Sequence, residues 1–298
     1  METPQTIAVR AYYDKFTKGF IRHGHGGRNY AIHRAVWGPG VRNRPEAIEY
    51  PNSIVLDRVA AHGARRVIDL GCGLGGAIAY MARRYPAQYV GLTVSPVQVE
   101  AGNKMLRPRF PRDTARIVVG DYHDPAAVCA AFGPSGADSV FAVESLIHSS
   151  EPELFFRSVS GALRDGGILI VIDDFISDDS RHESRDDPSD AKKARRFERD
   201  LSRFRTGWRV GSPLPLRAAV QLADAASLSL VDDRDLSLFL ELGRPRDRLF
   251  SALAPFLLLF GGWRRWGHIT GGVALQRLLR RGELGYHALV FQKREAAG

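Results

Sequence analysis

Short apolar runs alternate with helix-like stretches between residues 65 and 176. This pattern predicts strands at 66–70, 88–93, 115–119, 138–143 and 167–173, separated by helices at 75–84, 96–106, 124–131 and 151–163. Strands that alternate with helices in this way form a parallel sheet whose crossovers are right-handed. The pattern therefore predicts an α/β fold with a Rossmann-like core.

The pattern changes on both sides of this core. The first 64 residues are rich in aromatic and histidine side chains, whereas charge dominates from residue 177 to 215 and its second half could form a salt-bridged helix. A helix at 216–226 and strands at 228–234 and 286–291 resume the alternation. We expect a seven-stranded, mostly parallel sheet divided into an N-terminal helical lid (1–64), the core (65–176), a charged mobile lid (177–215), the completion of the sheet (216–235 and 284–298) and an apolar helical cap before the last strand (236–283).

Length and composition agree with one catalytic domain. The 298 residues are 44% hydrophobic, which supports a full core with material left for a cap. The two cysteines, Cys72 and Cys129, exclude a disulfide framework and predict a reducing, cytoplasmic compartment. No charged-then-apolar leader opens the chain, and the longest apolar run, about twelve residues from 249, is too short to span a bilayer.

The net charge of +9 raises the question of a nucleic-acid partner. The excess arginine is scattered through the chain, and no aromatic side chains are interleaved with it as in an RNA-binding strand. We therefore expect no nucleic-acid partner. A basic solvated surface, an anionic substrate and a membrane surface remain as explanations of the charge.

Residues 66–76, RVIDLGCGLGG, carry the strongest chemical signal. An apolar strand runs into a glycine turn and then a helix, which is how a doubly wound sheet builds a nucleotide-binding crevice. The G-x-G-x-x-G pattern would equally suit NAD. However, Asp69 at the strand tip would repel a pyrophosphate, and the acid expected about 20 residues later for an NAD ribose is missing. S-adenosylmethionine, which has no phosphate and carries a sulfonium and an ammonium, fits better.

Two segments resemble a known family. Residues 67–73 look like motif I of the class I, seven-stranded S-adenosylmethionine-dependent methyltransferases, and residues 91–98, GLTVSPVQ, are similar to a segment of the sterol, tocopherol and prenyl-diphosphate C-methyltransferase branch. The resemblance implies S-adenosylmethionine as cofactor, with Asp121 accepting a hydrogen bond from the adenine amino group. The implied cofactor residues are Asp69, Gly71, Gly73, Gly75, Thr93, Ser95, Gln98, Asp121 and Tyr122. Ser95-Pro96 is equally a good helix start, and Asp121 could simply cap its loop.

Glu144 and His148 are the candidate catalytic residues. Glu144 ends the strand at 138–143, at the sheet edge where open α/β sheets bind ligands. In alkene-methylating members of the resembled branch, a glutamate here stabilises a carbocation and removes its proton. Alternatively it bonds to a loop backbone or to the cofactor's ammonium group. His148 could be the base of an O- or N-methyltransferase, could orient Glu144, or could bond only within its loop.

Aromatic residues at both ends of the chain are candidates for the substrate side. Tyr-Tyr-Asp and His…Trp segments similar to those that cover the active site in related enzymes occur near the N-terminus, and the cap adds an apolar surface rimmed by arginine. The expected substrate residues are Tyr12, Tyr13, His33, Trp37, Trp208, Phe256, Trp263 and Tyr286. Core packing competes with this role, and the apolar patch also suits a homo-oligomer interface or peripheral membrane contact. The histidines at 23, 25 and 33 lack companion ligands, so we expect no metal site.

These observations predict an S-adenosylmethionine-dependent methyltransferase acting on a hydrophobic isoprenoid or terpenoid, including lipids and prenyl diphosphates. C-methylation through a carbocation is the preferred reaction, and Mg²⁺ would enter only with a diphosphate substrate. The alternative is O- or N-methylation of a polyketide or other small natural product, with His148 as base. An NAD(P)-dependent reductase is disfavoured because no Tyr-x-x-x-Lys is present. Dispersal of arginine disfavours a catalytically silent nucleic-acid-binding module.

Overall fold

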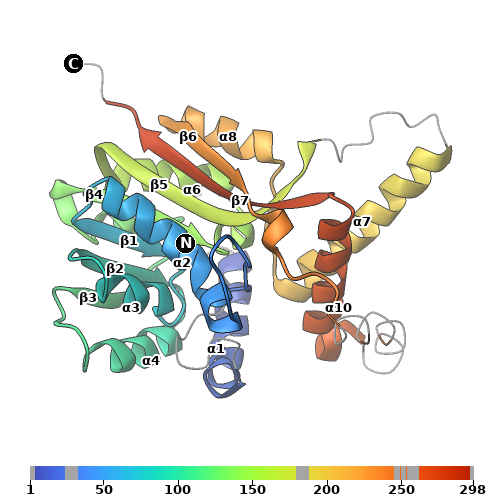
Figure 1. Cartoon of the computed structure of the whole chain (residues 1–298), viewed down its shortest axis with the longest axis horizontal. Helices are drawn as coiled ribbons and strands as arrows, with labels where there is room; N and C mark the ends of the chain where they lie inside the picture. Colours follow the sequence, from blue (N-terminus) through green and yellow to red (C-terminus); the bar gives the residue numbers. More distant parts are fainter. Residues whose placement is uncertain are drawn as a thin grey trace.

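A seven-stranded sheet in the order β3-β2-β1-β4-β5-β7-β6 forms the centre of the computed structural model (Figure 1), which describes residues 4–23, 33–178, 188–244 and 262–295 with positions 249 and 253. Strands β1 to β5 are parallel, whereas β7 runs antiparallel to both β5 and β6. The strands span Arg66–Leu70 (β1), Gln88–Thr93 (β2), Ala115–Val119 (β3), Ala137–Val143 (β4), Leu163–Ile176 (β5), Leu228–Asp235 (β6) and Leu284–Lys293 (β7). The predicted seven-stranded, mostly parallel fold is confirmed.

Helices cover both faces of this sheet. On one face α2, α3 and α4 share a buried cluster with the sheet, and on the other face α5, α6 and α8 do so. The helices are Pro4–His23 (α1), Arg44–Ala61 (α2), Gly76–Ala82 (α3), Pro96–Leu106 (α4), Pro125–Cys129 (α5), Pro152–Ala162 (α6), Pro188–Trp208 (α7), Leu216–Ala225 (α8) and Gly262–Arg280 (α10), with short 3₁₀ turns at Gly133–Ser135 (η1), Leu146–His148 (η2) and Ser237–Phe239 (η4). Because both faces are covered, β1 reads as an almost continuous apolar run.

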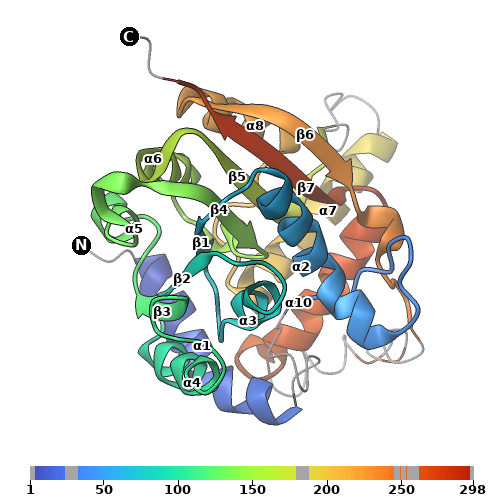
Figure 2. The same cartoon turned by 60° about the vertical axis from the view of Figure 1, so that its left-hand side comes forward.

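The order of the strands places a ligand site beside β1. Parallel neighbours lie on both sides of this strand, with β2 on one side and β4 on the other. The chain therefore leaves β1 in one direction and returns on its other side, which opens a crevice at the carboxyl ends of the strands. Figure 2 shows α1 lying beside β3 and α4.

Helices α7 and α10 lie together at one end of the sheet (Figures 1 and 2). They approach closely, because a Cβ added to Gly207 would lie 2.2 Å from the carbonyl oxygen of Gly267. Their shared cluster includes the buried Leu201 and Phe204 of α7. The buried Asp200 accepts a hydrogen bond of 3.0 Å from Arg281.

Most of the segment expected to be a charged lid is therefore α7, a long helix with a buried face. The many charged residues of this segment predicted salt bridges, such as that of Lys193 with Asp190 at 2.9 Å. They made the apolar positions that pack on α10 difficult to recognise in the sequence. The mobility of this segment stays a prediction, which hydrogen exchange would test. Among the described residues, no helix is both long enough and apolar enough to cross a membrane.

Candidate active site

A cavity of about 630 Å³ lies at the carboxyl ends of the central strands and extends under α1, α7 and α10. It has two halves. The wall next to β1, β2 and β4 includes Asp69, Gly71, Gly73, Thr93, Gln98, Asp121 and Tyr122. The other wall combines the segment after residue 32 with Phe204, Trp208, Leu240, Ile269, Val273 and Leu279. The first half contains most of the expected cofactor residues, and the second supplies an apolar chamber.

The glycine turn after β1 forms the floor of the cofactor half. Gly71, Gly73 and Gly75 have φ values of +74°, +55° and +78°, which side-chain-bearing residues rarely adopt. The amides of Gly71 and Cys72 both donate to the carbonyl oxygen of Leu92, at 2.9 and 3.0 Å. This turn brings bare backbone to the cavity surface, where a ligand can approach it closely.

Two buried polar atoms beside this turn fit the amino-acid part of S-adenosylmethionine. Among the described residues, Asp69 Oδ2 and Gln98 Nε2 have no hydrogen-bond partner. Burial raises the pKa of Asp69 well above its usual value. Gln98 accepts a hydrogen bond of 2.7 Å from Thr93 at its Oε1 atom, which leaves its amide nitrogen as the donor. An ammonium group would complement Asp69, and a carboxylate would complement Gln98, so these residues suit the cofactor.

Asp121 lies in the loop after β3, lines the cavity and is held by several donors. Its Oδ1 atom is 2.9 Å from both the backbone amide and Nδ1 of His123, while Oδ2 accepts from Thr6 of α1 at 2.9 Å. Burial raises the pKa of Asp121, but the bonds from His123 and Thr6 outweigh it and leave the pKa below its usual value. Asp121 is therefore an ionised acceptor, as the adenine role requires. Tyr122 lines the cavity and donates its hydroxyl to the Ser145 carbonyl at 3.1 Å.

Two expected cofactor residues do not line the cavity. Ser95 is the N-cap of α4. Its hydroxyl accepts a hydrogen bond of 3.1 Å from the backbone N–H of Gln98 and donates one to the carboxylate of Asp14 in α1. Gly75 is the N-cap of α3 in a left-handed conformation. Both positions shape the site through the backbone, so the structure favours the helix-start interpretation of Ser95 over direct contact.

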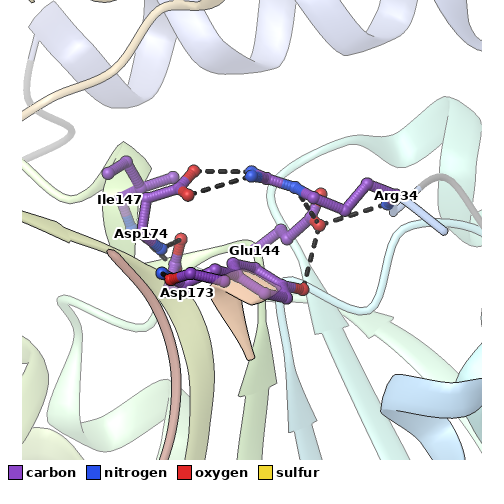
Figure 3. Close-up of polar contacts among 7 residues, drawn as sticks. Arg34, Glu144, Ile147, Asp173 and Asp174 are labelled. Carbon is purple, nitrogen blue, oxygen red and sulfur yellow. Dashed lines mark hydrogen bonds and ion pairs between the residues drawn. The ribbon is translucent and has the colours of Figure 1, made fainter. Parts of the chain in front are cut away.

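Glu144 lies at the end of β4 and lines the cavity. Its Oε1 atom accepts three hydrogen bonds, from the Arg34 amide at 3.1 Å, Arg34 Nε at 2.9 Å and the Tyr286 hydroxyl at 3.0 Å (Figure 3). Burial raises the pKa of Glu144, but Arg34 and the other neighbours outweigh it and leave the pKa below its usual value. The backbone of Glu144 is left-handed, with φ of +50°, which a non-glycine residue adopts only when its surroundings hold it there. Glu144 is therefore ionised and fixed in place.

Arg34 is the principal site residue that the sequence did not indicate. The edge of its guanidinium away from Glu144 donates to both carboxylate oxygens of Asp174, at 2.9 and 2.5 Å (Figure 3). Its carbon Cζ lies 4.5 Å from the centre of the Tyr286 ring. No local signal marks Arg34 among the many arginines, because its partners are 110 and 140 residues away.

Asp173 adds a third carboxylate beneath this pair. Its oxygens accept from the amides of Ile147, at 3.0 Å, and Asp174, at 2.9 Å, so it anchors the η2 turn to β5. Burial and the neighbouring Asp174 raise the pKa of Asp173 to about 8. Asp173 therefore keeps its proton at neutral pH and contributes little charge.

His148, at the end of η2, presents its imidazole to the cavity. Its Nδ1 atom lies 3.1 Å from the Arg209 carbonyl oxygen, and its Nε2 atom lies 3.2 Å from the Tyr13 hydroxyl. A carbonyl can only accept, so the neutral ring carries its proton on Nδ1 and leaves Nε2 as an acceptor. Burial lowers the pKa of His148 and raises that of Tyr13. His148 is consequently a neutral base beside a protonated phenol.

The expected substrate residues divide into three groups. Tyr12, Tyr13, His33 and Trp208 line the cavity. Trp37 does not line the cavity, because its ring packs against the buried Ala35, Ala47 and Ile48. Tyr286 does not line it either, because its side chain is fully buried and donates its hydroxyl to Glu144. Phe256 and the side chain of Trp263 lie outside the described residues.

Arg44 and Arg244 also line the cavity, beside the acid that they share. Glu241 lies 3.0 Å from Arg44 and 3.2 Å from Arg244. The cationic groups in the wall thus have carboxylate partners, as Arg34 does. Within the described ranges, no three histidine, cysteine or acidic side chains are grouped so that they could hold a metal ion.

Comparison with known proteins agrees with this geometry. Residues 68–171 match the family described as a methyltransferase domain. The O-methyltransferase cnsE of Penicillium expansum is 29% identical over 204 residues, 66% of this chain and 69% of that protein. The 2-methyl-6-phytyl-1,4-hydroquinone methyltransferase of Synechocystis sp. is 32% identical over 107 residues, 36% of this chain and 31% of that protein. A geranyl diphosphate C-methyltransferase from Streptomyces coelicolor A3(2), in complex with Mg²⁺, geranyl diphosphate and S-adenosyl-L-homocysteine, has a TM-score of 0.65 at 18% identity, with 98% of each chain covered.

Proposed function

Because the chain is an S-adenosylmethionine-dependent methyltransferase of class I, we propose that it methylates an oxygen or nitrogen atom of a hydrophobic small molecule, with His148 as the base. The bound cofactor supplies an electrophilic methyl group on a sulfonium. Asp69 and Gln98 would hold its amino-acid part, and Asp121 its adenine. The remaining task of the protein is to orient the acceptor and remove its proton.

The observation that carries this proposal is the placement of His148. The Arg209 carbonyl fixes the proton on Nδ1, and Nε2 faces the Tyr13 hydroxyl at the cavity wall. An acceptor hydroxyl or amine that replaces or joins this contact could give its proton to Nε2. Because burial lowers the pKa of His148, the imidazole is neutral and able to accept a proton at physiological pH.

Glu144 is the weaker base of the two candidates. Three donors share its Oε1 atom, and Arg34 outweighs the burial that would raise its pKa. A carboxylate with a lowered pKa takes up a proton less readily than a neutral imidazole does. The preference for C-methylation with Glu144 as base, which the sequence suggested, therefore gives way to the heteroatom alternative.

The chamber favours a hydrophobic acceptor without a diphosphate. Its α7 and α10 walls present Phe204, Trp208, Ile269 and Val273, whereas the nearby arginines are already paired with acids. The substrate in the name of the Synechocystis relative is a hydroquinone with a phytyl chain, so it combines ring hydroxyls with an isoprenoid chain. We propose an acceptor of this general kind, an isoprenoid or similar natural product bearing a hydroxyl or amine.

C-methylation through a carbocation is the second candidate, because the ionised Glu144 carboxylate forms part of the chamber wall. Only its Oε1 atom bonds to other described residues, so Oε2 could stabilise positive charge on the acceptor. In that reaction Glu144 would act through its charge, and the acceptor proton could pass to His148.

A panel of acceptors tests both candidates. The wild-type enzyme is incubated with labelled S-adenosylmethionine and with 2-methyl-6-phytyl-1,4-hydroquinone, an apolar phenol, an apolar secondary amine or geranyl diphosphate, and the methylated atom is identified by NMR. We expect a product with an oxygen or nitrogen acceptor. His148→Asn should then lower kcat by roughly 10²–10⁴, and more than Glu144→Gln does.

The control is His62→Asn, since His62 lies after α2 and outside the cavity. It should leave kcat unchanged. Methylation at carbon would refute the proposed heteroatom reaction, and a His148→Asn enzyme with wild-type turnover would refute the proposed base.

A further inference from the structure

Arg34 joins two elements that end at the same edge of the sheet. Its amide and Nε bond to Glu144 at the end of β4, while its two terminal nitrogens bond to Asp174 of β5 (Figure 3). The paired bonds to Asp174 match the planar fork of a guanidinium, which the ammonium of lysine cannot reproduce. Arg34 is therefore placed by geometry as well as by charge.

Arg34 supplies the positive charge that pairs with both Glu144 and Asp174. Its side chain is 18% exposed, and those of Glu144 and Asp174 are 16% and 1% exposed. The titratable groups that face the cluster are Glu144 at the end of β4, Asp173 and Asp174 (β5), Tyr286 and His287 (β7), Tyr13 (α1), His148 (η2) and His33 beside Arg34. Without Arg34, two buried carboxylates would lose the cation that bonds to both of them, which is costly in a low-dielectric interior.

The segment that carries Arg34 also contacts the cap side of the cavity. Val36 forms a β-bridge with Leu240, and the Trp37 amide donates to the Phe239 carbonyl at 2.7 Å. His33, Arg34 and Leu240 all line the cavity. The segment therefore connects the strand ends to the loop that leads toward α10, and it forms one wall of the acceptor chamber.

We propose that Arg34 is a positioning residue that fixes the orientation of Glu144 and closes this wall of the acceptor chamber. Among the described residues, the hydrogen bonds and ion pairs of the Arg34 side chain go to Glu144 and Asp174, not to the cofactor half of the cavity or to His148. The inference rests on the proposed function for its effect on the acceptor. Its effect on the carboxylates can be measured without any acceptor.

The first experiment measures urea denaturation of the wild type, Arg34→Met, Arg34→Lys and Arg34→Met/Glu144→Gln at pH 5 and pH 7. Methionine keeps much of the side-chain volume but removes the charge. We expect the denaturation midpoint of Arg34→Met to fall by about 1 M or more at pH 7 and by much less at pH 5, where protonation relieves the unpaired carboxylates. Arg34→Lys should lose less, and Glu144→Gln should partly restore the midpoint of Arg34→Met, because the unpaired charge is removed.

The matched control is Arg58→Met, which removes a more exposed ion pair with Asp232 between α2 and β6. Its midpoint should change little, and equally at both pH values. A loss for Arg34→Met that is the same at pH 5 and pH 7 and is not relieved by Glu144→Gln would overturn the proposal. If Arg34→Met does not fold at pH 7, the denaturation midpoints of Arg34→Lys and Arg34→Met/Glu144→Gln at pH 5 and pH 7 are compared in its place.

The second experiment uses 2-methyl-6-phytyl-1,4-hydroquinone, or the best acceptor of the panel. Arg34→Lys should raise the acceptor KM at least tenfold, shift the acidic limb of kcat/KM to higher pH, and change the Kd of S-adenosyl-L-homocysteine by less than about threefold. An unchanged KM and pH profile would refute the chamber role. If His148→Asn keeps wild-type turnover while the pH-dependent loss at Arg34 persists, the proposed base fails and the role of Arg34 stands.

Discussion

A Cβ placed on Gly71 would lie 2.5 Å from the Cβ of Ser145. The turn after β1 and Ser145, two residues after β4, therefore approach so closely that only glycine fits at position 71, where φ is also positive, at +74°. Gly71→Ala should displace the turn and lower the affinity for S-adenosyl-L-homocysteine at least tenfold, measured by calorimetry.

The control for this prediction is Gly63→Ala. Gly63 also has a positive φ, +67°, but no atom lies within 4 Å of its added Cβ. It should cost about 1 kcal/mol of stability through backbone strain and leave ligand affinity unchanged. Equal affinities for the two variants would mean that the close approach at Gly71 does not shape the site.

Asp69→Asn should weaken cofactor binding while stabilising the unliganded protein. The folded-state pKa of Asp69 is raised, so the unfolded chain loses this proton at lower pH than the folded chain does. Stability therefore falls as pH rises above the unfolded pKa, and a neutral asparagine removes that loss at pH 7. We expect Tm to rise by about 2 °C and the affinity for S-adenosyl-L-homocysteine to fall about tenfold or more. A lower Tm in the absence of ligand would contradict this account.

The same reasoning gives a pH dependence for Asp173. Its pKa is about 8 in the folded protein, against an ordinary value near 3.8, so the folded chain binds the extra proton between these values. Its contribution to stability is present below about pH 4 and is progressively lost up to about pH 8. Asp173→Asn should flatten the stability profile between pH 6 and 8, with a pH-independent cost of about 1 kcal/mol because one amide loses its acceptor. Urea denaturation at several pH values in this range measures the profile. If the pKa of Asp173 is not raised, the variant and the wild type will show the same dependence of unfolding free energy on pH.

The crossing of α7 and α10 gives a prediction about packing. Gly207→Ala would place a methyl group 2.2 Å from the Gly267 carbonyl oxygen and must separate the helices. We expect the free energy of unfolding to fall by roughly 2–3 kcal/mol and the apolar acceptor to bind more weakly. Gly161→Ala in α6 is the matched control, since its Cβ would meet only the Cys129 sulfur, at 3.8 Å. It should stabilise the protein by up to about 1 kcal/mol.

The cofactor half of the site could be predicted from sequence because its parts are local. Asp69, Gly71 and the helix that follows lie within one short segment. Its sequence therefore indicates the strand, the glycine turn and the ligand-binding position together. The parallel sheet followed from the alternation of strands with helices, and the long β5, Leu163–Ile176, exceeded the predicted 167–173 only at its ends. Helix caps such as Ser95 were also readable, although the segment alone did not separate capping from ligand contact.

The acceptor half could not be predicted in this way because its contacts join distant parts of the chain. Arg34 meets Glu144 and Asp174 only after the sheet has formed, and neither acid shows in sequence which cation it will meet. The position of Trp37 could not be predicted for the same reason, since an indole beside a loop can turn to the cavity or, as here, to a small apolar cluster. In α7 the abundant charges hid Leu201 and Phe204, which only the presence of α10 makes into a core.

The position of β7 between β5 and β6 has a consequence for biosynthesis. This strand is translated after every other strand, yet it supplies the pairing edge for β6 and the Tyr286 hydroxyl that bonds to Glu144. While the ribosome still holds residues 284–293, β6 lacks the strand with which it pairs, and Glu144 lacks one of its three hydrogen-bond donors. The nascent chain can therefore assemble the cofactor crevice during translation, but the set of donors around Glu144 is complete only after this last strand has emerged and inserted.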